Sequence, residues 1–143
     1  MGTMRVDHLT TAAGIQAANW ITSRIYQRTG DAKLIFPVDW MPATGICVYD
    51  ADDTLLCVAI LYLEKSSPVA VCGWCVTNPE NASRTSRAAV KLAMSVLPVY
   101  AHEHGAKYLL TIFGNRGINR ILDDLGYITT EDSENKFILT RGV

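Results

Sequence analysis

Two unbroken apolar runs constrain the fold of this chain more than any other feature. Leu55–Leu63 and Val69–Thr77 are too evenly apolar to keep one face in water, so both are predicted to be central strands covered on both faces. Ser66, Ser67 and Pro68 turn one run into the other. A shorter run, Ile46–Tyr49, lies before the acidic turn at residues 50–53, which predicts a β-hairpin with Leu55–Leu63.

The periodicity changes to that of a helix after Asn78-Pro79. One face of a long helix ending near His104 and Gly105 is marked by Ala89, Ala93, Val96, Leu97 and Tyr100. Pro98 lies inside it and cannot donate to the carbonyl of Met94, so we expect a kink or a late break. Tyr108–Phe113 is then a buried strand. The crossover from Val76 to Phe113 predicts a parallel, right-handed pair of strands.

Further elements are predicted at both ends of the chain. Asp7 to Leu9 end a first strand, and Thr10 or Thr11 caps a helix that stops at Gly30. Its inner face is expected at Ile15, Ala18, Ile21 or Thr22, and Ile25.

Near the carboxyl terminus, Ile118, Ile121, Leu122 and Leu125 form an amphipathic helix that Asn115 caps and Gly126 ends. The last strand, 136–140, is expected at the edge of the sheet, where it leaves room for a homodimer.

The 143 residues are expected to form one domain, 1–143. The fold class is α/β (α+β): a mixed, mostly antiparallel sheet of six or seven strands with helices on both faces. A net charge of −1 gives no field that would gather nucleic acid or an anionic membrane. No apolar run reaches the roughly 20 residues of a membrane span. We expect no signal peptide, because no apolar stretch follows Met1 to Arg5. We expect a cytoplasmic protein with reduced cysteines.

The carboxyl-terminal third resembles the GNAT superfamily of N-acetyltransferases. In that family a strand ends in Asn, a helix follows, and Leu-Gly-Phe or Leu-Gly-Tyr closes it, as Asn115 to Leu125-Gly126-Tyr127 do here. Val76, Pro79 and the basic, small-residue helix start resemble the family's acetyl-CoA segment. Small phage-encoded proteins resemble the family with similarly eroded cofactor loops, so a phage-type member is one alternative.

The resemblance implies acetyl-CoA as co-substrate. A splayed strand end would offer backbone groups to its pantetheine arm, and a helix start would offer amides to its pyrophosphate. The positions implied are Cys75, Val76, Thr77, Asn81, Ala82, Ser83, Arg84, Thr85, Ser86, Arg87, Asn115 and Arg120. The chain departs from the family because its loop, residues 81–88, has no glycine. Hydroxyls and two arginines would have to donate in place of the backbone.

The catalytic groups depart from the family too. Its usual acid is a Tyr seven residues after the Asn, where this chain has Leu122. Either a solvent proton replaces that acid, or Tyr127 or Tyr108 does, or the domain no longer catalyses. Glu80 is the first candidate for the base, followed by Glu64. Asp39, Trp40 and Trp74 are the candidates for contacting the acceptor amine.

Metal and redox chemistry find less support. His102 and His104 do not share a helix face. Cys72 and Cys75 have C-x-x-C spacing, but residues three apart in a regular strand point to opposite faces and no second pair completes a zinc site. Structural cysteines are therefore predicted, and no metal.

Three functions remain open. The first is transfer of an acetyl group to an amine of a small molecule or of a protein, by direct attack on acetyl-CoA. The second is a catalytically degenerate GNAT-like module that binds a protein or has a structural role, which the missing glycines and tyrosine favour. The third is a thiol-redox protein built on Cys72 and Cys75.

Overall fold

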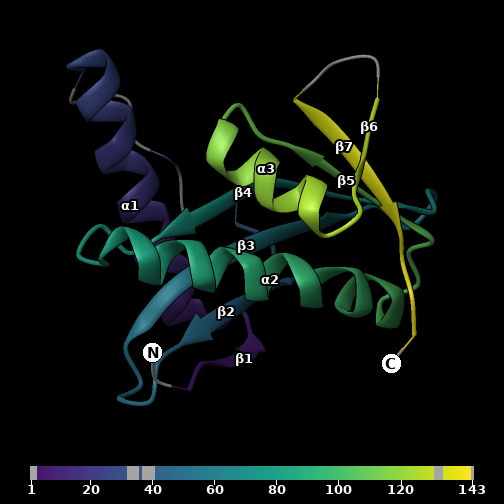
Figure 1. The fold of residues 1–143 in the computed structure, drawn as a ribbon, viewed down its shortest axis with the longest axis horizontal. Helices are drawn as coiled ribbons and strands as arrows, with labels where there is room; N and C mark the ends of the chain where they lie inside the picture. The colour runs from purple at the N-terminus through teal and green to yellow at the C-terminus, as the bar shows by residue number, and fades with distance from the viewer. Residues whose placement is uncertain (1–2, 32–35, 37–40, 131–133, 143) are drawn as a thin grey trace.

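The computed structural model describes residues 3–31, 36, 41–130 and 134–142. These residues form a seven-stranded sheet and three helices (Figure 1). The elements in chain order are β1 Arg5–His8, α1 Thr11–Thr29, β2 Gly45–Tyr49, β3 Leu55–Leu63, β4 Val69–Thr77, α2 Ser83–Glu103, β5 Tyr108–Ile112, α3 Arg116–Asp124, β6 Ile128–Thr129 and β7 Asn135–Leu139. The predicted fold class is confirmed.

The strands lie in the order β1-β2-β3-β4-β5-β7-β6. Among the described strands, β4 and β5 pair in parallel, as the crossover through α2 predicted, and the other neighbours are antiparallel. The last long strand was expected at the edge of the sheet, and this prediction is wrong. β7 lies between β5 and the short strand β6, which the sequence pattern did not reveal, so β6 occupies that edge.

The helices cover both faces of the sheet. α2 packs along one face over β2, β3, β4 and β5, with α3 beside it, while α1 lies against β3 and β4 on the other (Figure 1). Each face has its own buried cluster, one including Met94 and Leu97 of α2 and the other Ala17 and Ile21 of α1. β3 runs between these clusters, which explains its even apolarity: the first seven of its nine residues are buried.

The helix ends follow the predicted caps. The hydroxyl of Thr10 accepts a hydrogen bond from the amide of Ala13, and Gly30 ends α1 with φ at 71°. The predicted inner face of α1 is wrong at Ile15, which is 43% exposed. The buried stripe runs instead through small residues, including Ala13 and Ala17, which let the helix lie close to the sheet.

A bulge in β4 changes which side chains share a face. Ile60 of β3 lies opposite Trp74 and Tyr62 lies opposite Val71, so one β3 residue faces two β4 residues, Cys72 and Gly73. The predicted alternation therefore fails. Cys72 and Cys75 both pack on the α2 face, whereas a regular strand would separate them.

Candidate functional site

A cleft opens where the two parallel strands diverge. Pairing between β4 and β5 ends at Cys72 opposite Thr111, and β4 continues to Thr77 with only β3 as its neighbour. The gap is part of a cleft of about 1050 Å³. α1 supplies one wall, the start of α2 another, and the end of β5 with the start of α3 a third.

The backbone of β4 presents polar groups to this cleft. The amide of Asn78 donates to the carbonyl of Leu56 on the β3 side at 2.9 Å. Because backbone direction alternates along a strand, the amides and carbonyls of Cys75 and Thr77 point the other way, into the gap that β5 has left. One of these groups has a protein partner: the guanidinium of Arg24 donates to the Thr77 carbonyl at 2.8 Å and to its hydroxyl at 3.1 Å.

The start of α2 forms the second polar wall. The first amides of a helix have no acceptor within the helix, and the N-cap of α2, Ala82, offers none from its side chain. Ser83, Ser86 and Arg87 line the cleft beside them. The side-chain amide of Asn81 donates to the carbonyl of Leu56 and to Ser86 Oγ, which fixes this turn to β3. The helix dipole and Arg87 together give this wall a positive potential, which suits an anionic group.

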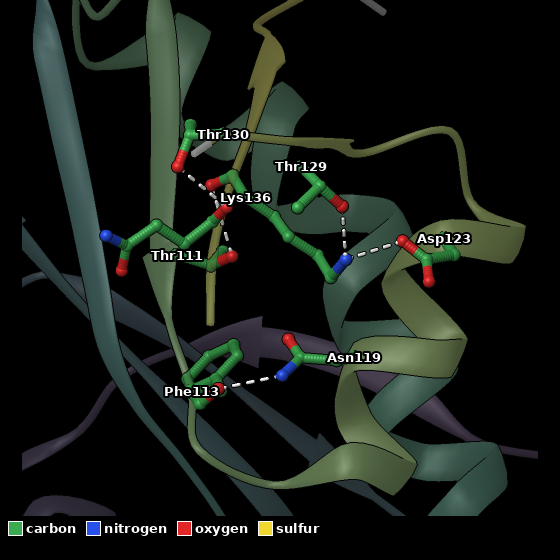
Figure 2. A network of polar contacts seen from close by, with 8 residues as sticks. Thr111, Phe113, Asn119, Asp123, Thr129, Thr130 and Lys136 are labelled. Atoms are coloured by element: carbon green, nitrogen blue, oxygen red, sulfur yellow. Dashed lines mark hydrogen bonds and ion pairs between the residues drawn. The ribbon is translucent and has the colours of Figure 1, made fainter. Parts of the chain in front are cut away.

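The third wall is held by polar contacts of α3. Asn115 lines the cleft and caps α3, since its side-chain oxygen accepts from the amide of Ile118 at 3.1 Å. Asn119 donates its side-chain amide to the carbonyl of Phe113 at 2.8 Å, which ties α3 to the end of β5 (Figure 2). Within the described residues, Asn119 Oδ1 is buried with no hydrogen-bond partner.

A buried lysine supports that wall from behind. Lys136 of β7 is almost fully buried, and its Nζ contacts Asp123 Oδ1 at 2.6 Å and Thr129 Oγ1 at 2.7 Å (Figure 2). The ion pair and hydrogen bond compensate the cost of burying the ammonium group. No sequence signal singled out this lysine, because its partners lie in two other elements.

The cleft brings together most of the residues implied by the resemblance. Those that line it are Trp74, Cys75, Val76, Thr77, Asn81, Ser83, Ser86, Arg87 and Asn115. Ala82, Arg84, Thr85 and Arg120 lie beside the lining residues in sequence but not among them, and neither Glu80 nor Tyr127 is part of the lining. Asp39 and Trp40 lie outside the described residues.

Tyr127 has a structural partner and does not line the cleft. Its hydroxyl donates at 2.8 Å to the carbonyl of Met94, the group that Pro98 leaves without an amide donor. Burial raises the pKa of Tyr127 far above its usual value. Leu122, at the position of the family's tyrosine, is fully buried, and the described lining of the cleft contains no tyrosine.

The structure also adds residues that sequence reasoning missed. Glu134, at the start of β7, lines the cleft with its carboxylate beside Gly114. Arg24 and Arg28 line it from α1, one and two turns after Ile21. This spacing was a usable signal, because positions 21, 24, 25 and 28 share one helix face. Glu64, by contrast, is remote, since it follows the end of β3 that pairs with the start of β4.

The described part of the chain shows neither a metal cluster nor a membrane-spanning helix. No group of three or more His, Cys, Asp or Glu side chains there is placed to hold a metal ion. None of its helices combines the length and apolarity needed to cross a bilayer.

No protein-family model and no curated protein matches this chain. Solved structures do match it along nearly its whole length. A GCN5-related N-acetyltransferase from Kribbella flavida has a TM-score of 0.65 at 15% identity, covering 98% of both chains. A GNAT-family acetyltransferase from Streptococcus pneumoniae has a TM-score of 0.66 at 7% identity, covering 97% of this chain and all of the other. A chimera of the Vibrio cholerae spermidine N-acetyltransferase SpeG and hSSAT has a TM-score of 0.62 at 10% identity, covering 96% of this chain and 95% of the other. The chain therefore has the fold of the GNAT acetyltransferases.

Proposed function

We propose that this protein is an acetyl-CoA-dependent N-acetyltransferase. One observation carries the proposal: the cleft joins the free backbone edge of β4 to the uncapped start of α2. Acetyl-CoA has a peptide-like pantetheine arm and an anionic pyrophosphate. An extended arm with amide groups can pair with the outward backbone of Cys75 and Thr77 as an added strand would. The pyrophosphate suits the first-turn amides and Arg87.

The residues present therefore fit this substrate without a glycine-rich loop. The small side chains of Ser83 and Ser86 leave room near the helix start, and their hydroxyls add donors. Arg24 holds the Thr77 carbonyl, so the Thr77 amide and both backbone groups of Cys75 remain for the arm.

The chemistry is direct attack of the acceptor amine on the thioester carbonyl. The new C–N bond forms as the C–S bond breaks, and the amine loses a proton to a base. Glu134 is the carboxylate in the described lining and the best candidate for that base. No tyrosine lines the described cleft to protonate the departing thiolate, so we assign that proton to solvent. A free thiolate is a weak enough base to leave without an acid, since thiol pKa values lie near about 8.5.

The acceptor class is an amine of a small molecule or of a protein. The Vibrio cholerae–hSSAT chimera with this fold is named for spermidine, a polyamine. In this chain the acceptor would enter from the α1 side of the cleft, where Trp74 lies next to Phe36 with ring centroids 5.2 Å apart. Fold alone does not choose among amines.

Calorimetric titration with acetyl-CoA tests the binding step. We expect micromolar affinity, about −8 kcal/mol. Arg87→Ala should weaken it by roughly ten- to a hundredfold, because a charge-assisted contact is worth about 1.5–3 kcal/mol. Arg84→Ala is the matched control: it removes the same charge from the same helix turn, but Arg84 does not line the cleft. Equal losses in both variants would show that only net charge matters, and no binding at millimolar acetyl-CoA would refute the enzyme.

A second function is favoured by the buried Leu122 at the position of the family's acid. It is a GNAT-fold module that binds its ligand or a protein partner without catalysis. Release of free CoA thiol in the presence of an amine panel separates the two. Acetyl-CoA binding with no amine-dependent thiol release would favour the module, and amine-dependent release together with an acetylated product establishes the transferase.

A further inference from the structure

Two cysteine side chains meet at the wall of the cleft. Cys57 of β3 and Cys75 of β4 have their Sγ atoms 3.6 Å apart. They are diagonal neighbours, because Cys57 lies opposite Thr77 and Cys75 lies opposite Ala59. Only Cys75 belongs to the C-x-x-C pair of the sequence, and its thiol contacts Cys57, a thiol of the adjacent strand.

The two thiols differ in access. Cys75 is partly exposed and lines the cleft, whereas Cys57 is fully buried. The hydrogen bond with Cys75, followed by burial, raises the pKa of the Cys57 thiol well above its usual value. Cys57 therefore keeps its proton, and Cys75 is the thiol that a reagent in the cleft can reach.

A cation lies close to the pair. The guanidinium of Arg24 is held by the carbonyl and hydroxyl of Thr77, which lies opposite Cys57 in the β3–β4 ladder and two residues after Cys75. The other two cysteines lack this setting: Cys72 is buried with its thiol donating to the Trp74 carbonyl, and Cys47 is buried in the cluster on the α1 face.

We propose that Cys75 is a peroxide-reactive thiol of the cleft and that Cys57 converts its oxidised form into a disulfide. The Cys75 thiolate attacks a hydroperoxide, gives a sulfenic acid and releases an alcohol, or water from hydrogen peroxide. The Cys57 thiol then attacks the sulfenic sulfur while its proton passes to the sulfenic oxygen, so that an S–S bond forms and water leaves. One hydroperoxide is reduced and two thiols are oxidised.

The disulfide would change the cleft. Diagonal partners have Cα atoms farther apart than a disulfide prefers, so the end of β4 has to shift when the bond forms. β5 does not restrain that end, because it pairs no further than Cys72 opposite Thr111, so the shift works against the β3–β4 pairing alone. The backbone groups of Cys75 move with it, so oxidation lowers the affinity of the cleft for its ligand.

Peroxide titration of the folded full chain tests the proposal. After quenching with an alkylating reagent, peptide mapping by mass spectrometry should find a Cys57–Cys75 disulfide that a phosphine reverses. Cys57→Ala should leave a sulfenic acid on Cys75 that dimedone traps. Cys75→Ser should give neither product. Cys47→Ala is the matched control, and it should form the Cys57–Cys75 disulfide as readily as the unaltered chain.

Peptide mapping of the unaltered chain tests the proposal even if a variant fails to fold. Oxidation of Cys47 or Cys72 before Cys75 would overturn the proposal, as would a disulfide from Cys75 to Cys72. A folded chain whose Cys75 stays unoxidised, while its unfolded form reacts, would overturn it too. Because these readouts are masses, they stand or fall independently of acetyl-CoA binding.

Discussion

The hydroxyl of Tyr127 replaces a hydrogen bond that Pro98 removes from α2. In a regular helix the amide of residue 98 would donate to the carbonyl of Met94, and proline has no amide hydrogen. Tyr127 donates to that carbonyl at 2.8 Å from outside the helix. α2 consequently continues past Pro98 to Glu103, and the late break that the sequence left open does not occur.

Tyr127→Phe removes this donor and leaves a buried carbonyl unpaired. An unsatisfied buried acceptor costs about 1–3 kcal/mol of unfolding free energy. With a urea slope of about 2 kcal/mol per M, the denaturation midpoint should fall by roughly 1 M.

Pro98→Ala restores an amide that can donate to Met94, so the same Tyr127→Phe change in that background should cost about 0.5 kcal/mol or less. The difference between the two costs is the coupling energy of a double-mutant cycle. The coupling energy does not include the packing contacts that the Pro98→Ala substitution removes, because that cost is common to both variants that carry Pro98→Ala.

Equal costs of Tyr127→Phe in both backgrounds would refute this role. The cycle also separates a structural from a catalytic role. If Tyr127 were the general acid, Tyr127→Phe would lower kcat in either background. We expect kcat of the folded variant to be unchanged, and a large loss of kcat with an unchanged midpoint would return Tyr127 to the chemistry.

Two further predictions concern the wall behind the cleft. Asp123→Ala should destabilise the domain by about 2 kcal/mol, because it leaves the buried ammonium of Lys136 unpaired. Lys136→Met should change the free energy of unfolding in urea by less than about 1 kcal/mol. A larger loss for Lys136→Met than for Asp123→Ala would contradict this account. Asn115→Ala should cost about 1 kcal/mol through the lost cap on the Ile118 amide, and an unaltered midpoint would count against the cap.

Local signals predicted the fold well where each rested on a few neighbouring residues. The cap at Thr10, the stop at Gly30 and the strands β3 and β4 follow from such signals, and the structure has them. Contacts between segments that are distant in sequence were harder to predict. The position of β7 depends on β6, a strand of two residues that no apolar pattern marks.

In the site, too, local signals were predictable and contacts between distant segments were not. The cleft-lining residues of β4 and of the start of α2 follow one another in sequence, so a resemblance could locate them. The hydrogen bond of Tyr127 could not be predicted locally, because its partner, the Met94 carbonyl, is made available by Pro98 in another element. The faces of Cys72 and Cys75 were misread because a bulge depends on the strand opposite, which a single run of residues does not reveal.

Backbone amide NMR during a titration with acetyl-CoA tests the central claim most directly. The claim is that the diverging end of β4 and the uncapped start of α2 form one binding site. We predict large shifts at the amides of Cys75 and Thr77 and in the first turn of α2, with the remote turn at Glu64 unchanged. Shifts confined to other surfaces, or no shifts at millimolar acetyl-CoA, would contradict it.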